Sequence, residues 1–149
     1  MITPLVMGNW KMAIDLDGVV SFKAMWSSKR LLKGVEIAIA PPAPYLAQMT
    51  DLPNVSLAGQ DASTQSIGAR TGDVSAKMLS DFTCRYVIVG HSERRQNYAE
   101  ANEQIAGEAG QVRALGMTPV VCAGESASER EAGLAEDFVT RQVIDSCVG

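Results

Sequence analysis

The chain contains a single histidine, His91, which follows the apolar segment YVIVG at residues 86–90. Parallel α/β folds place their binding sites at the carboxyl ends of the strands, so a histidine here is well placed for chemistry. A helix that begins at this point would direct backbone N–H groups at the imidazole and keep it neutral. The residue types alone also allow the simpler interpretation, a solvated loop histidine.

Lys11 is the second candidate, two residues after Asn9 in the segment LVMGNWKM at 5–12. If this segment is a strand, the alternation of side chains places Asn9 and Lys11 on one face. An ammonium group there suits a phosphate or a carboxylate, whereas the other interpretation is a lysine that extends to the rim of the sheet. Further charged groups could act as acid, base or clamp, or form structural ion pairs: Glu93, Arg94, Arg95 and Glu125.

The three cysteines, Cys84, Cys122 and Cys147, are too few and too widely spaced for a disulfide framework or for paired metal ligands. We predict reduced thiols and no metal site. Cys122 ends an apolar segment, which favours a small core residue over a nucleophile.

Composition restricts the class of protein. The chain has 149 residues, 46% of them hydrophobic, with 13 Lys and Arg against 17 Asp and Glu. A net charge of −4 makes nucleic acid or an anionic membrane an unfavourable partner. The sequence has no apolar run of about 18 residues and no leader pattern, so we predict one domain over 1–149 and a cytoplasmic location.

Hydrophobic periodicity predicts five strands, each followed by a helix. The strands are expected at 5–12, 36–40, 55–60, 86–90 and 118–122. The helices are marked by Val19, Phe22 and Trp26, by 43–49, by 75–81, by Ile105, Ala109, Val112 and Leu115, and by a final segment that carries Leu134, Phe138 and Val139 inward.

Local signals complete this outline. Ser128 and Glu131 have the spacing of a capping box at the start of the final helix, and 61–73 is expected to be a long exposed loop. Strict alternation implies parallel strands with right-handed crossovers. The pattern leaves open a doubly wound sheet with helices on both faces and a piece of a (β/α) barrel.

Four motifs closely resemble the triosephosphate isomerase family: GNWKM at 8–12, GARTGDVSAKML at 68–79, YVIVGHSERR at 86–95 and VVCAGE at 120–125. They occur in the family's order and spacing along the whole chain. The resemblance implies the fold of a (β/α)₈ barrel. About five of its eight units are present in this sequence, so we expect a partial or open barrel. The resemblance likewise implies interconversion of dihydroxyacetone phosphate and glyceraldehyde 3-phosphate through an enediolate, with no cofactor.

The resemblance also implies roles for individual residues. Lys11 would be the cation beside the substrate phosphate and the enediolate, and Asn9 would position the substrate. His91 would be the neutral electrophile that polarises the substrate oxygens. Ser92 and Glu93 would be its neighbours, with Glu93 placed to interact with Lys11.

By the same resemblance, the loop with Arg70, Thr71 and Gly72 would reach the neighbouring subunit of a homodimer, near that subunit's Asn9 and Lys11. Arg70 stands where the family often has an aromatic residue. We expect a homo-oligomer or a companion chain that completes the barrel, because five strands leave unpaired edges and an open concave face.

The resemblance stops at five units, whereas a complete barrel needs about 250 residues. No segment of the sequence resembles the family's base glutamate, its lid or its phosphate-binding amides. We therefore expect a polypeptide of these 149 residues to be inactive alone. The alternative is a non-catalytic folding or association module. In either case we predict strand order 1-2-3-4-5, with Ala38, Ala40, Ala58 and Gly59 facing the barrel interior.

Overall fold

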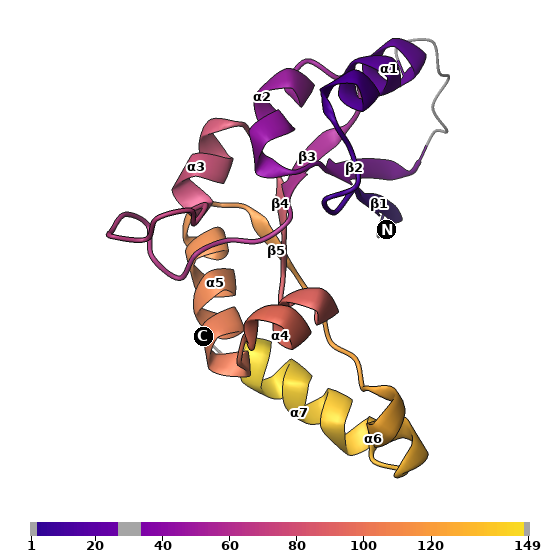
Figure 1. Ribbon diagram of the computed structural model, residues 1–149, viewed down its shortest axis with the longest axis vertical. Helices are drawn as coiled ribbons and strands as arrows, with labels where there is room; N and C mark the ends of the chain where they lie inside the picture. The colour runs from indigo at the N-terminus through magenta and orange to yellow at the C-terminus, as the bar shows by residue number, and fades with distance from the viewer. Residues whose placement is uncertain (1–2, 27–33, 148–149) are drawn as a thin grey trace.

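The computed structural model describes residues 3–26 and 34–147. Its five parallel strands lie in the order β1-β2-β3-β4-β5, as predicted, and curl into a partial barrel (Figure 1). β2 (Glu36–Ala40) has the predicted bounds, whereas the other four strands are shorter than predicted: β1 (Leu5–Asn9), β3 (Ser56–Gly59), β4 (Tyr86–Val89) and β5 (Thr118–Val121).

Figure 1 shows the first helices in succession along the outside of the curved sheet. The helical segments are α1 (Leu16–Trp26), the short 3₁₀ turn η1 (Ala43–Tyr45), α2 (Leu46–Met49), α3 (Ala76–Asp81), α4 (Ser92–Tyr98), α5 (Asn102–Ala114), α6 (Ala127–Glu131) and α7 (Ala135–Cys147). The predicted apolar face of α1 is confirmed, since Val19 is fully buried and Phe22 and Trp26 pack against the same core. Gly116, with φ +76°, ends α5 as expected.

The two faces of the sheet carry two different cores. On the outer face, Ile39 and Val87 pack beneath the helices, whereas Ala38, Ala40 and Ala58 lie in a separate cluster on the concave face. The prediction for these three alanines is confirmed. The prediction for Gly59 is wrong, because it follows Ala58 directly and alternation turns it outward, where an added Cβ would lie 2.5 Å from Leu79 Cδ1.

The C-terminal helices begin at other residues than predicted. The capping box is formed by Ser126 and Glu129, whose side chains each accept a hydrogen bond from the other's backbone N–H, and it opens α6 rather than α7. Gly133, with φ +73°, separates the two helices and resets the phase of the second. Leu134 is therefore 53% exposed, not inward, whereas Phe138 and Val139 are half-buried. The buried residues of α7 are Gln142 and Ser146.

Within the described residues, no helix is both long and apolar enough to cross a membrane.

Candidate active site

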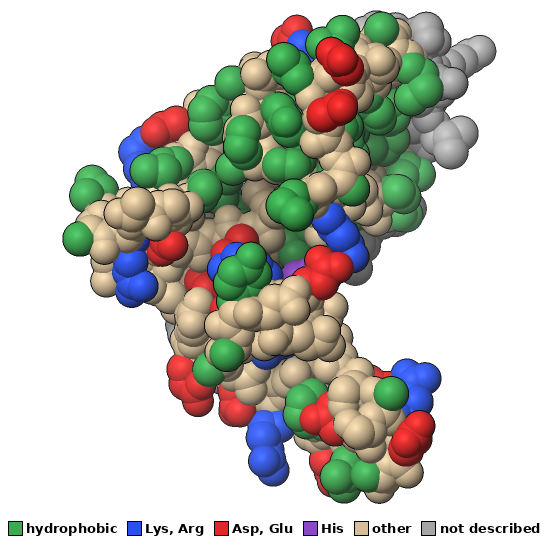
Figure 2. Space-filling model, in the orientation of Figure 1, with side chains coloured by type: hydrophobic (Ala, Val, Ile, Leu, Met, Phe, Trp, Pro, Cys, Tyr) green, Lys and Arg blue, Asp and Glu red, His purple; other side chains and the backbone are tan. Residues whose placement is uncertain are grey.

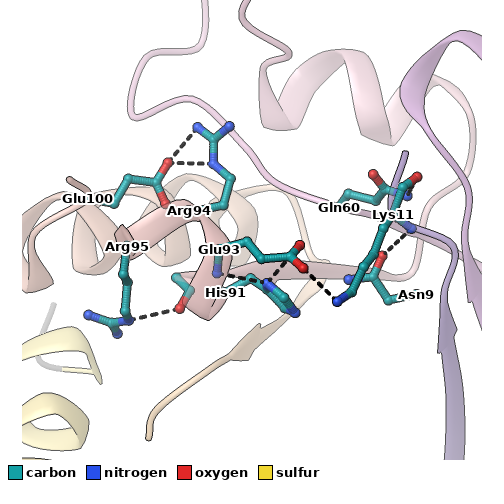
Figure 3. Close-up of polar contacts among 9 residues, drawn as sticks. Asn9, Lys11, Gln60, His91, Glu93, Arg94, Arg95 and Glu100 are labelled. Atoms are coloured by element: carbon teal, nitrogen blue, oxygen red, sulfur yellow. Dashed lines mark hydrogen bonds and ion pairs between the residues drawn. The ribbon is translucent and has the colours of Figure 1, made fainter. Parts of the chain in front are cut away.

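Lys11, His91 and Glu93 meet at the carboxyl ends of β1 and β4 (Figure 3). Lys11 Nζ lies 2.7 Å from Glu93 Oε1, and Glu93 Oε2 lies 3.6 Å from His91 Nδ1. In Figure 2 the histidine lies at the surface between a basic and an acidic side chain. The structure thus brings together three residues named from the sequence, and it confirms the expected Glu93–Lys11 contact.

A turn, rather than the strand, positions Lys11. β1 ends at Asn9, and Lys11 adopts φ +52°, so the predicted shared strand face does not extend to Lys11. Asn9 Oδ1 accepts a hydrogen bond from the Lys11 backbone N–H at 2.9 Å. Gln60 Nε2 donates to Lys11 O at 3.0 Å and to Ala40 O at 2.8 Å, which fixes the turn against β2.

Gln60 is a site residue that the sequence analysis missed. It directly follows β3, and its side chain links the ends of β1 and β2 (Figure 3). A polar residue at a strand's carboxyl end was the available signal, the same signal that singled out His91.

His91 is the N-cap of α4, as the sequence predicted. Its Nδ1 accepts a hydrogen bond from the Glu93 backbone N–H at 3.2 Å. This contact directs Nδ1 toward the N-terminus of α4 and leaves Nε2 as the ring nitrogen that can donate to a ligand. The side chain is 23% exposed, which leaves this donor within reach of a small molecule.

Glu93 is engaged by Lys11. The hydrogen bond from Lys11 lowers the pKa of Glu93, and desolvation opposes this only in part. Glu93 is therefore an anion that orients Lys11 rather than a free base. Ser92 is exposed at the first position of α4 and, with His91, lines a cavity of about 490 Å³ between the ends of β4 and β5.

The neighbouring arginines belong to structural networks. Arg95 donates to Gly90 O at 2.8 Å, Cys122 O at 3.0 Å, Asn102 Oδ1 at 2.7 Å and Ser146 Oγ at 3.3 Å. It thereby joins the ends of β4 and β5 to α5 and α7. The sequence left its role open between clamp and structural pair, because three of its four partners lie more than five residues away along the chain.

Two further candidates lie apart from the Lys11 ion pair. Glu125 pairs with Arg130 at 2.5 Å, and its own backbone N–H together with Arg130 lowers its pKa. Cys122 lies against the concave cluster, and burial raises the pKa of its thiol, which agrees with its interpretation as a core residue.

The loop with Arg70, Thr71 and Gly72 is exposed and projects beyond α3 (Figure 1). Arg70 and Gly72 line a second cavity, of about 530 Å³, together with Asp61 and Arg94. Within this chain the loop is thus placed at a cavity other than that of His91.

Comparison with known proteins identifies relatives along nearly the whole chain. The family model described as triosephosphate isomerase matches residues 4–148. The triosephosphate isomerase of Thiobacillus denitrificans is 48% identical over 142 residues, and that of Paracidovorax citrulli is 46% identical over 151. Each alignment covers 93% of this chain but only 56% and 58% of the relative, so the chain spans little more than half the length of these proteins.

A solved structure gives the same result in three dimensions. The crystal structure of triosephosphate isomerase from Bartonella henselae superposes with a TM-score of 0.90 at 32% sequence identity. The match covers 99% of this chain and 62% of that structure. The two folds therefore agree over all five strand-helix units.

Proposed function

Because the chain belongs to the triosephosphate isomerase family, we propose that the protein interconverts dihydroxyacetone phosphate and glyceraldehyde 3-phosphate, in the cytoplasm. The observation that carries this proposal is the convergence of Lys11 and His91 around Glu93 at the carboxyl ends of β1 and β4. Such a site offers an ammonium group and an imidazole hydrogen-bond donor side by side.

The reaction moves a proton between two adjacent carbons, and negative charge develops on the substrate oxygens. A preorganised ammonium and an N–H donor stabilise that charge because they need no reorganisation during the reaction. In our proposal Lys11 Nζ faces the phosphate and the developing enediolate, His91 Nε2 donates to the carbonyl and hydroxyl oxygens, and Asn9 positions the substrate. Glu93 acts through Lys11 as a positioning residue.

A base that removes the carbon-bound proton must be a separate group, since Glu93 is already paired with Lys11. We propose that a polypeptide of these 149 residues is inactive alone and gains turnover when mixed with a polypeptide that carries the last three units of the Thiobacillus denitrificans relative. General-base catalysis is typically worth 10²–10⁴ in rate. A coupled spectrophotometric assay of glyceraldehyde 3-phosphate formation measures the difference.

The variants K11M and H91Q should each abolish the turnover of the mixture, whereas the control K77M, at an exposed lysine of α3, should leave it unchanged. Turnover by the 149 residues alone that survives H91Q would refute the proposed roles. Association without any turnover would favour the alternative, a non-catalytic association module.

We also propose that the protein forms a homodimer or larger assembly through the loop 61–73, which carries Arg70, Thr71 and Gly72. Ile67 in this loop is 89% exposed, and β1 and β5 present unpaired backbone edges in the described sheet. Sedimentation velocity at micromolar concentration tests this, and a stable 15.9 kDa monomer would refute it.

A further inference from the structure

Three carboxyl groups meet on the outer side of the sheet, away from the cavity beside His91. Asp61 follows β3, Glu100 lies in the turn between α4 and α5, and Glu108 is on α5. One oxygen atom from each lies within 4.8 Å of the others. Asp61 and Glu108 line the cavity of about 530 Å³, where the amides of Gln60 and Gln104 also lie.

Two of these carboxyl groups are buried, the third is half-buried, and each has an oxygen without a hydrogen bond. Glu100 is 5% exposed and Glu108 is 1% exposed, whereas the Asp61 side chain is 25% exposed. Among the described residues, Asp61 Oδ1, Glu100 Oε2 and Glu108 Oε2 are buried and have no hydrogen-bond partner. A buried polar atom without a partner is unfavourable, so three of them in one cluster indicate a ligand that the protein side chains do not supply.

Arg94 is the basic side chain that contacts the cluster. Arg94 lies 2.9 Å from Asp61 Oδ2 and 2.5 Å from Glu100 Oε1, whereas Glu108 Oε1 accepts only the Gln104 amide, at 2.9 Å. Burial raises the pKa of Asp61 to about 7 and that of Glu108 to about 8, so a cation that binds here must displace protons from these groups. Arg70 and Asp73, which have opposite charges, also line the cavity.

We propose that Asp61, Glu100 and Glu108 bind a divalent, oxygen-preferring cation of the size of Ca²⁺, which has a structural role. Ca²⁺ takes carboxylate oxygens at about 2.3–2.6 Å, so oxygens on opposite sides of the ion lie about 4.6–5.2 Å apart, and the observed cluster fits within that span. Mg²⁺ needs distances of about 2.0–2.1 Å and a regular octahedron, which would require the cluster to contract.

Such an ion would join three separate parts of the chain. It would hold the residue that follows β3, and with it the start of the loop 61–73, against the α4–α5 turn and α5. The cavity has room for the water molecules and amide oxygens that would complete six to eight ligands. The ion is independent of the proposed isomerase chemistry, because none of its ligands lines the cavity beside His91.

Isothermal titration calorimetry tests this inference on purified protein that has been treated with EDTA and dialysed. CaCl₂ is the titrant, with MgCl₂ in a parallel experiment. We expect one saturable Ca²⁺ site per chain with a dissociation constant on the order of 10⁻⁴ M, weaker binding of Mg²⁺, and a thermal midpoint that rises with Ca²⁺ concentration.

Two glutamine variants on α5 provide the matched comparison. E108Q keeps the shape of the side chain and leaves both Arg94 ion pairs intact, so it should fold and bind Ca²⁺ at least tenfold more weakly. E103Q, on an exposed position of the same helix, should bind like the unchanged protein. The inference is overturned if Ca²⁺ does not bind at millimolar concentration, if E108Q binds as tightly as the unchanged protein, or if E103Q weakens binding equally. A lysine or arginine of another subunit seated in the cluster would also prevent Ca²⁺ binding, and so would overturn it.

Discussion

Arg95 holds the site region together, and its replacement by methionine should destabilise the fold strongly. Its guanidinium donates to the backbone oxygens of Gly90 and Cys122, which are the residues that follow β4 and β5. Methionine has a similar length but no donor. The Asn102 and Ser146 side chains still bond to each other, at 3.2 Å, so R95M leaves mainly the two backbone oxygens without partners.

The expected cost follows from those two oxygens. A buried acceptor without a partner costs about 1–3 kcal/mol, and Gly90 is buried whereas Cys122 is partly open to water. Burial also lowers the pKa of the Arg95 guanidinium, because the charged group loses contact with water. Methionine carries no charge, so R95M removes this desolvation penalty and offsets part of the loss. The net loss should therefore be about 2–4 kcal/mol, and R95K should lie between R95M and the unchanged protein because an ammonium cannot reach all four acceptors.

Urea unfolding followed by the fluorescence of Trp10 and Trp26 measures these differences. The control is R141M, at an exposed arginine on α7, which should shift the free energy of unfolding by less than about 0.5 kcal/mol. If R95M costs no more than R141M, the four hydrogen bonds do not stabilise the ends of β4 and β5, and our account of the network is wrong.

Three further predictions concern single side chains. G59A should lower the free energy of unfolding in urea by about 1–3 kcal/mol, because the new Cβ would lie 2.5 Å from Leu79, which is 1% exposed. G124A is the control, since no atom lies within 4 Å of its new Cβ, and it should change this free energy little. Equal losses in the two variants would contradict the prediction. Burial raises the pKa of the Cys84 thiol to about 11, so at pH 8 this thiol carries about a hundredfold less thiolate than an ordinary cysteine. Ellman's reagent should therefore label the exposed Cys147 before Cys84, and simultaneous labelling of the two would refute this. The pKa of Glu93 should lie below its ordinary value of 4.5, so the ion pair with Lys11 is present above pH 4.5 and is lost as the pH falls through the lowered pKa. Carbon NMR should show that the pKa of Glu93 rises in K11M. An unchanged pKa would exclude Lys11 as the cause of the shift.

Local patterns in the sequence determined the alternating parallel α/β arrangement and the position of one catalytic candidate, but they left a doubly wound sheet and a partial barrel open. The strand segments are short apolar runs that alternate with helical periodicity, and such periodicity depends only on residues close in the chain. His91 was found in the same way, because a polar residue after YVIVG that begins a helix must lie at the carboxyl edge of a parallel sheet. Glu93 then follows within two residues, on the first turn of α4.

Tertiary structure alone decided which groups meet and which are buried. Lys11 and Glu93 are 82 residues apart, and the turn with φ +52° that aims Lys11 has no periodic signal. Asp61, Glu100 and Glu108 look like ordinary surface acids in the sequence, yet the fold brings the segment after β3, the α4–α5 turn and α5 together, so that Glu100 and Glu108 are buried beside Asp61. The physical reason is that burial and charge pairing depend on distances across the fold, whereas sequence patterns report only the neighbours along the chain.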